Sequence, residues 1–120
     1  MRPTGPEDPN LKALLVALER AARKNKAPVW GVVAERLGGA RRKRVRVNLY
    51  EISRNAGGAK QVVVPGKVLG TGALDKGISI AAWDFSASAR AKIAAAKGKA
   101  LGIAELVEAN PAGSGVKILV

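Results

Sequence analysis

The aliphatic residues of this chain fall into short runs of two kinds, and the way these runs alternate limits the folds that are possible. Strand-like runs occupy 45–49, 61–65, 78–83, 99–103 and 116–120. Helical patterns precede them and lie between them. A strand, helix, strand order of this kind indicates the α/β class. We therefore predict one small α/β domain of short interleaved strands and helices, with an N-terminal extension of two helices.

Two helices are expected before the first strand. Asp8 can cap a helix in which Pro9 takes the first position and leucines recur at helical spacing to about Lys24. Pro28 opens a second helix, which the glycines at 38–39 end with left-handed backbone available at either. The apolar stripe of this second helix is predicted to consist of Val29, Val32, Val33 and Leu37.

The remaining elements follow from spacing and capping residues. Over 45–49 the aliphatic residues alternate with Arg46 and Asn48, which predicts a half-buried strand with one aliphatic and one cationic face. Residues 53–60 are predicted to form a turn. Ser86 is expected to cap a helix running to about Lys97, and residues 104–109 to form the last helix.

The 120 residues are 48% hydrophobic, enough for one domain with its own core. Residues 1–9, rich in Pro and Gly, are predicted to be a flexible leader. The domain then spans 10–120, divided into a helical part at 10–39 and a strand-and-helix core at 40–120. No apolar run approaches the roughly 18 residues of a membrane span, which favours a soluble intracellular protein with no membrane partner.

Charge is the strongest compositional signal. The chain holds 21 Lys and Arg against 9 Asp and Glu, a formal net charge of +12. Residues 1–60 carry 14 of the basic and 5 of the acidic side chains. Such an excess repels itself in the unbound protein, so it predicts a polyanionic partner that meets the first half most strongly.

Enzyme chemistry has few candidates in this sequence. There is no Cys and no His, so thiolate nucleophiles, the usual general base and the commonest metal ligand are missing. We therefore expect no enzyme, no cofactor, no metal site and no small-molecule substrate. The acids considered for a catalytic role, none with a partner to complete a site, are Asp75, Asp84, Glu105 and Glu108.

The glycine-rich stretch VVVPGKVLGTGALDKG at 62–77 could be a nucleotide loop or a set of turns. It lacks the Gly-Lys-Ser or Gly-Lys-Thr ending of a P-loop, and Asp75 stands where a dinucleotide loop would meet pyrophosphate. Turns between short strands are the favoured interpretation. A third possibility is that the glycines bring backbone N–H groups to phosphates, with Lys67 or Lys76 nearby.

Five cations occur within six positions at 41–46, with no acid between Arg36 and Glu51. Charge runs are often only solvated, but arginine binds phosphate oxygens with a planar fork, so this run favours nucleic acid. Charge does not distinguish DNA from RNA. The second helix offers few polar side chains to read bases, which disfavours sequence-specific DNA binding. Trp30 could stack on an unpaired base or pack into the core.

Five stretches together resemble one family. They are NKAPVW (25–30), the basic run into VNL (41–49), VVVPGKVLG (62–70), FSASARAKI (85–93) and NPAGSGVKI (110–118). In this order they are similar to the large-subunit ribosomal protein called eighteen-e in archaea and eukaryotes, which is related in its second half to bacterial protein fifteen. The length favours an archaeal member. The resemblance implies an irregular wrapped arrangement of strands and helices, and a structural role on the cytoplasmic ribosome beside ribosomal RNA and neighbouring ribosomal proteins.

The resemblance also implies RNA contacts at particular residues, to which Lys24 and Arg54 are added on charge alone. The full set is Lys24, Lys26, Trp30, Arg41, Arg42, Lys43, Arg44, Arg46, Arg54, Lys67 and Lys117. Backbone turns near RNA are expected at Gly66, Gly70, Gly72, Gly113 and Gly115. The burial of Trp83 is left open. The alternatives are an architectural protein that coats DNA through the same charges and, less favoured, an RNA-processing enzyme.

Overall fold

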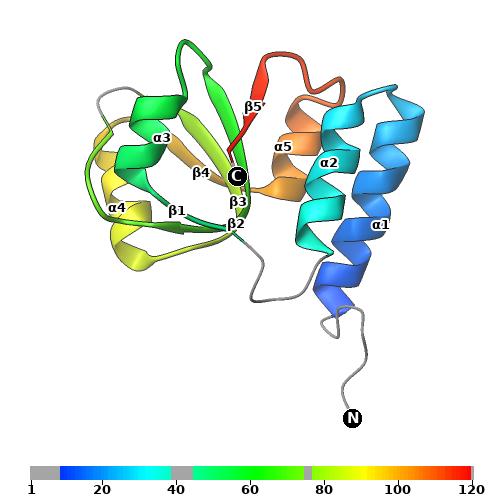
Figure 1. Ribbon diagram of the computed structural model, residues 1–120, viewed down its shortest axis with the longest axis horizontal. Coiled ribbons are helices and arrows are strands. Elements are labelled where there is room, and N and C mark those ends of the chain that lie inside the picture. Colours follow the sequence, from blue (N-terminus) through cyan, green and yellow to red (C-terminus); the bar gives the residue numbers. More distant parts are fainter. Residues whose placement is uncertain (1–8, 39–44, 75–76, 120) are drawn as a thin grey trace.

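The computed structural model describes residues 9–38, 45–74 and 77–119, in which helices and strands alternate after two initial helices (Figure 1). The elements are α1 (Pro9–Lys24), α2 (Pro28–Leu37), β1 (Val45–Asn48), α3 (Leu49–Asn55), β2 (Gln61–Leu69), β3 (Ser79–Phe85), α4 (Ala87–Ala95), β4 (Lys99–Gly102), α5 (Ile103–Ala109) and β5 (Val116–Ile118). The predicted α/β class is confirmed.

The five strands form one sheet in which every described pair is parallel. β2 lies at its centre, with β3 and then β4 on one side. The other edge of β2 is shared, because β5 pairs with residues 61–63 and β1 pairs with residues 66–69. The last strand and the first therefore lie end to end along one neighbour.

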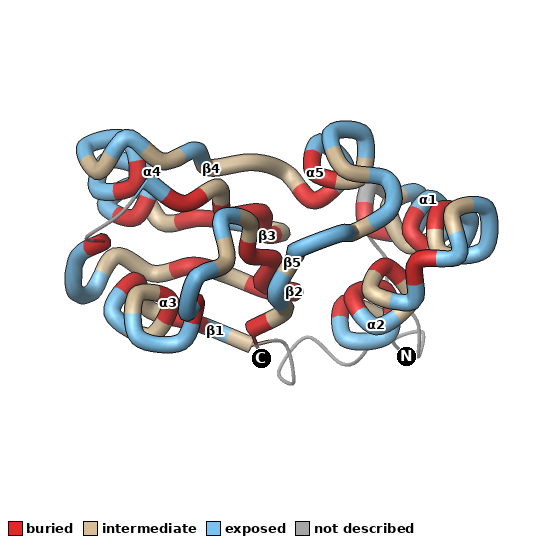
Figure 2. The backbone as a smooth tube through the Cα atoms, turned by 90° about the horizontal axis from the view of Figure 1, so that it is seen from above, coloured by how far each residue is buried: buried red, intermediate tan, exposed pale blue. Residues whose placement is uncertain are grey.

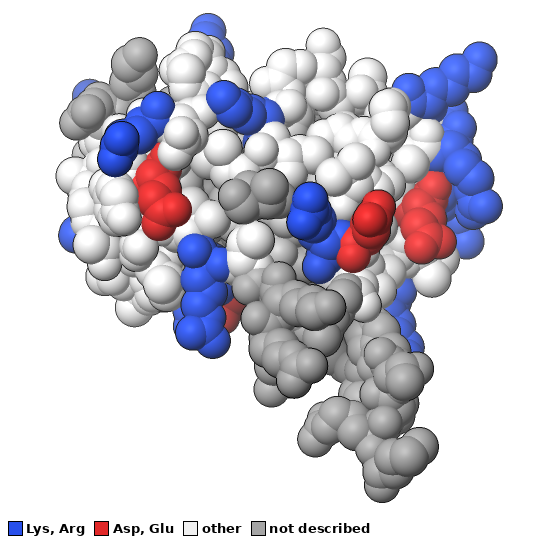
Figure 3. All heavy atoms as spheres, in the orientation of Figure 1, with Lys and Arg blue, Asp and Glu red and all other residues white. Residues whose placement is uncertain are grey.

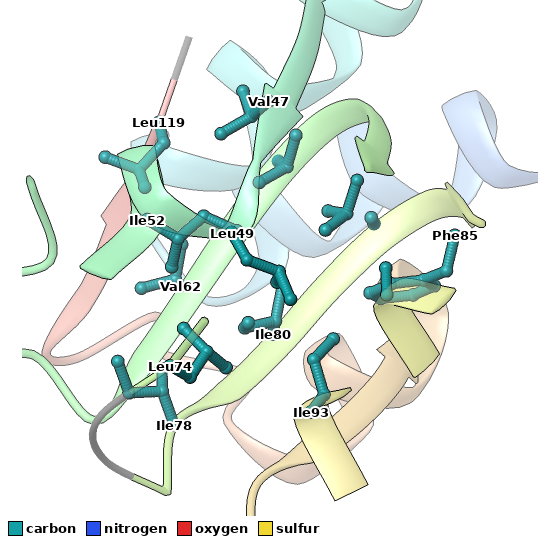
Figure 4. Packing of buried hydrophobic residues seen from close by; sticks show 14 of the residues in the cluster. Val47, Leu49, Ile52, Val62, Leu74, Ile78, Ile80, Phe85, Ile93 and Leu119 are labelled. Atoms are coloured by element: carbon teal, nitrogen blue, oxygen red, sulfur yellow. The ribbon is translucent and has the colours of Figure 1, made fainter. Parts of the chain in front are cut away.

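Helices cover both faces of the sheet, which creates two hydrophobic cores (Figure 2). Val62 and Val64 of β2 belong to the core under α3 and α4, parts of which Figure 4 shows from close by. Val63 belongs to the core under α1, α2 and α5. Alternate residues of one strand thus supply opposite cores, as the pleat of a strand requires.

The predicted bounds of α1 and α2 are confirmed, but the buried face of α2 differs from the predicted stripe. Val32 is 40% exposed, and the buried residues are Trp30, Val33, Ala34 and Leu37. The prediction missed Trp30 and Ala34 because it used only aliphatic spacing. Gly38 has a right-handed backbone (φ −74°) and not the left-handed one considered for it, and Gly39 lies outside the described residues.

The sequence prediction missed α3. Leu49 was assigned to the strand, but the strand ends at Asn48 and the chain turns into a helix that includes the first part of the predicted 53–60 turn. The Glu51 carboxylate explains the change, since its Oε1 accepts from the backbone N–H of Asn48 at 3.3 Å. This is one half of a capping box, a local signal that alternation of aliphatic residues had obscured.

β2 runs further than predicted. It continues through Pro65 and Gly66 to Leu69, so that part of the stretch expected to turn is strand. The pairing with β3 is irregular between Val64 and Lys67, where Pro65 has no N–H to donate to a neighbour. The helix predicted after Ser86 is confirmed: the Ser86 hydroxyl oxygen accepts from the backbone N–H of Ala89 at 3.1 Å.

Candidate nucleic-acid interface

The positive charges of the described residues lie on the surface. Each described Lys and Arg is exposed except Lys67, which is half-buried, and the described part of the chain buries no polar or charged residue. Figure 3 shows basic side chains over α1 at one end of the molecule and others scattered over the α3 and α4 end. Neither core buries these charges, so the side chains that make no bond within the protein are available to a partner.

The strongest sequence signal lies mostly outside the described residues. The undescribed segment that follows Gly38 and precedes Val45 contains Arg41, Arg42, Lys43 and Arg44. Arg46 is described: it is exposed on β1, and its neighbour Val47 is buried, as the alternation predicted.

Arg46 has a basic neighbour across the sheet. It is in register with Lys67 of β2, which is in register with Asp84 of β3. Residues in register on neighbouring strands share a face, so these three side chains form a row. In the sequence, Arg46 stands two positions after the undescribed basic segment. Lys67 Nζ lies 3.8 Å from the Asp84 carboxylate, so Asp84 offsets part of the charge of Lys67. Arg46 has no described ion pair.

Trp30 does not fit the RNA contact that the resemblance implied. Its side chain is fully buried, and its Nε1 donates to the carbonyl of Pro111 at 2.8 Å. Core packing, the other possibility for this residue, is what is found, because a buried indole cannot stack on a base. Trp83 is partly buried against the same core.

The Trp30 bond joins two stretches that lie far apart in sequence. Gly113 turns beside α2 with a left-handed backbone (φ +68°), and a Cβ there would overlap Cγ1 of Val29. Asn110 Nδ2 fixes the same loop by donating to Gln61 Oε1 at 2.7 Å and to Ser114 O at 2.8 Å. The stretches NKAPVW and NPAGSGVK therefore form one surface region, with Lys26 exposed in the first and Lys117 exposed in the second.

Four of the five glycines predicted to approach RNA are packed against the protein itself, and Gly115 is the exception, with nothing within 4 Å of an added Cβ. A Cβ on Gly66 would overlap the carbonyl oxygen of Val45, and one on Gly70 would lie 2.8 Å from the Ser88 Cβ. At Gly72, where φ is +92°, it would lie 2.8 Å from the backbone nitrogen of Tyr50. These positions need glycine for internal packing, which agrees with the favoured interpretation of the stretch as structural backbone.

Sequence analysis missed Lys92 of α4. Its ammonium donates to the carbonyls of Gly70 at 2.6 Å and of Gly72 at 2.9 Å, so it holds the glycine loop against α4. No spacing rule links a lysine to a loop twenty residues earlier, so the sequence carried no signal for it. Arg90 of the same helix lies over the Phe85 ring, 5.0 Å from its centroid.

Two of the acids considered for catalysis have structural partners. Asp84 pairs with Lys67, and Glu105 Oε1 accepts from the backbone N–H of Gly102 at 3.2 Å, which caps α5. Glu108 is exposed on the same helix, and Asp75 lies outside the described residues. Within the described ranges, no three carboxylates gather in a group that could hold a metal ion. None of the described helices is long and apolar enough to cross a membrane.

Comparisons with known proteins agree with one another. A sequence model of the family described as ribosomal protein 60S L18 and 50S L18e matches residues 2–120. The large ribosomal subunit protein eL18 of Archaeoglobus fulgidus is 46% identical over 113 residues, which cover 94% of this chain and 97% of that protein. The protein of the same name from Methanopyrus kandleri is 45% identical over 122 residues, covering 98% and 96%. That from Methanoregula boonei is 45% identical over 112 residues, or 93% of each.

Proposed function

Because this chain belongs to the family of ribosomal protein 60S L18 and 50S L18e, we propose that it binds ribosomal RNA and holds packed RNA segments in place. Family membership makes it a structural constituent of the large ribosomal subunit, at work in translation on the cytoplasmic ribosome, and not an enzyme. Its partners are accordingly ribosomal RNA and other ribosomal proteins. We further propose which side chains make the contacts with that RNA.

The observation that carries the RNA contacts is the surplus of exposed cations that form no ion pair. Among the described residues, only Lys67 makes an ion pair. Positive charge kept on the surface and left unpaired repels itself until a polyanion arrives, and RNA phosphates are such a polyanion. The same cations neutralise phosphates without reading bases, so recognition is by RNA shape.

The proposed contacts form two groups. The first consists of the basic run, Arg41, Arg42, Lys43 and Arg44, together with the exposed Arg46 and its neighbour Lys67. The second comprises exposed side chains at the end of α1 and on α3 and β5, namely Lys24, Lys26, Arg54 and Lys117. Trp30 is removed from the set because it is buried. The proposed role of the glycines is to shape the backbone beneath this surface; they are Gly66, Gly70, Gly72, Gly113 and Gly115.

We also propose that residues 10–120 behave as one domain. The helical part packs on the sheet through Val63 and Ala81, so the core under α1, α2 and α5 is built from both parts of the chain. A single cooperative unfolding transition would support this, and two separate transitions would contradict it.

Salt dependence tests the interface directly. The variant Arg42→Ala, Arg44→Ala, Arg46→Ala should bind large-subunit ribosomal RNA more weakly. The slope of log K against log salt should fall by about 0.7–0.9 for each phosphate that the variant no longer neutralises. The matched control is Lys12→Ala, Arg20→Ala, Arg23→Ala, which removes three exposed cations outside the proposed set and should change the slope less.

An unchanged slope in the triple variant would remove these residues from the interface. Competition between duplex DNA and ribosomal RNA provides a second test. Duplex DNA that displaced ribosomal RNA equally well would support a DNA-coating protein and contradict specific binding to ribosomal RNA.

A further inference from the structure

A pocket of about 310 Å³ lies where the end of β5 meets α3 and β1. Its lining residues are Val47, Glu51, Asn55, Lys117, Ile118 and Leu119. It lies on the shared edge of β2, where the first and last strands meet end to end. Figure 4 shows Val47 and Leu119 at the margin of the core under α3. The volume is at the small end of ligand pockets and suits one planar ring system.

The lining divides into an apolar and a polar part. Val47 and Leu119 belong to the core under α3, so two aliphatic side chains offer a surface against which the face of a ring can pack. Ile118 lines the pocket from the strand, while its side chain packs against the core on the other face of the sheet. Lys117 is exposed and supplies a cation. Glu51 and Asn55 lie on α3, one helical turn apart, and bring polar groups to the same pocket.

The polar groups of α3 retain acceptors that the fold does not use. Both described hydrogen bonds to the Glu51 carboxylate end on Oε1, at 3.3 Å from the backbone nitrogen of Asn48 and 3.2 Å from its Nδ2. Asn55 Nδ2 donates to the backbone carbonyl of Glu51 at 2.8 Å. Glu51 Oε2 and Asn55 Oδ1 are therefore available to accept hydrogen bonds from an occupant.

We propose that this pocket holds one unstacked base of the ribosomal RNA, its N–H edge toward Glu51 and its phosphate toward Lys117. This inference rests on the proposed function, since it specifies how that RNA is bound. Single-stranded RNA is recognised by splaying a base out of the stack and bonding its edge. Guanine suits the pocket well because N1–H and the N2 amino group are adjacent donors that a carboxylate can accept together.

The charges make a base a better occupant than a phosphate alone. A phosphate inside the pocket would meet the Glu51 carboxylate, which repels it. A base donating to that carboxylate gains a charge-assisted hydrogen bond while its phosphate stays near Lys117. A protein strand added at β5 would pair through its backbone and would not need Glu51 Oε2.

The test uses the full chain, large-subunit ribosomal RNA and the variant Glu51→Gln. Glutamine keeps an Oε1 acceptor for the Asn48 N–H, as capping boxes accept either residue, but it replaces Oε2 with an N–H donor. Glu108→Gln, which removes the same charge from an exposed site on α5, is the matched control. Glu51→Gln should weaken RNA binding about tenfold, the effect of one lost hydrogen bond to a charged group. Glu108→Gln should bind as tightly as wild type or more tightly.

The outcomes separate this inference from the proposed function. If the wild-type chain fails to bind ribosomal RNA, the proposed function fails. If wild type binds while Glu51→Gln matches Glu108→Gln or exceeds it, only charge matters at this place and the base-binding pocket is refuted. Equal thermal midpoints for the two variants exclude loss of the α3 cap as the cause of weaker binding.

Discussion

Replacing Gly66 with alanine should separate β1 from β2. The added Cβ would overlap the carbonyl oxygen of Val45 and lie 3.0 Å from its carbonyl carbon. Gly66 and Val45 are in register, so the clash is between backbones and no rotamer can relieve it. Close carbon to oxygen contacts between strands are about 3.3–3.6 Å, so β1 must shift by on the order of 1 Å.

The cost can be estimated from what that shift breaks. Overpacking costs roughly 1–3 kcal/mol, and each backbone hydrogen bond broken in the short β1 ladder adds about 1 kcal/mol. Gly66→Ala should therefore lower the free energy of unfolding by about 3–5 kcal/mol. At roughly 4 °C per kcal/mol for a domain of this size, the thermal midpoint should fall by about 12–20 °C.

Thermal and urea unfolding of Gly66→Ala measure this, with Gly58→Ala as the control. At Gly58 a Cβ would meet nothing within 4 Å and φ is not positive, so alanine should stabilise the fold by about 0.4–1 kcal/mol. If Gly66→Ala unfolded within about 1 kcal/mol of wild type, internal packing would not be the reason for this glycine. Backbone approach to RNA would then be its remaining role.

Three further changes test other parts of the molecule. Gly115→Ala puts a Cβ into open space at φ +74°, so strain alone should cost about 1–2 kcal/mol in urea unfolding, and an unchanged midpoint would contradict this. Trp30→Phe loses the hydrogen bond to the Pro111 carbonyl and should lower the free energy of unfolding by about 1–3 kcal/mol. The salt dependence of RNA binding should stay as in wild type, and a weaker salt dependence would return Trp30 to the interface. Lys26 has a left-handed backbone (φ +50°), which glycine adopts with less strain, so Lys26→Gly should raise the thermal midpoint. The same change removes a proposed phosphate ligand, so RNA affinity should fall. RNA affinity that did not fall would exclude Lys26 from the interface.

The sequence predicted the elements whose signals are local. Pro9 and Pro28 mark helix starts, and Ser86 marks a cap; the structure has helices beginning at or directly after each. Each strand-like run contains a strand, although Leu49 and Ile103, at the ends of two of the runs, begin helices. α3 was missed because Leu49 continued the alternation of the preceding strand, while the Asn48 and Glu51 cap that stops the strand was not considered.

The site was harder to predict than the fold. Exposure of Arg46 followed from alternation along a strand, but burial of Trp30 depended on a carbonyl 81 positions away. The Lys92 bonds to the glycine loop are long-range in the same sense. To predict the pocket beside α3, one would have to know that β5 and β1 share one edge of β2, and no single stretch of the sequence encodes the order of strands in a sheet.

The central claim is that this protein is held in the large ribosomal subunit by contacts with its RNA. The most direct test is to wash ribosomes from a native lysate with high salt, separate them on a density gradient, and measure this protein in each fraction. Salt weakens every phosphate contact, so a protein that stays on the subunit after the wash is also held by packing against folded RNA and not by surface charge alone. We expect one copy for each large subunit after the wash. Recovery with chromosomal DNA, or unbound at the top of the gradient, would contradict the claim.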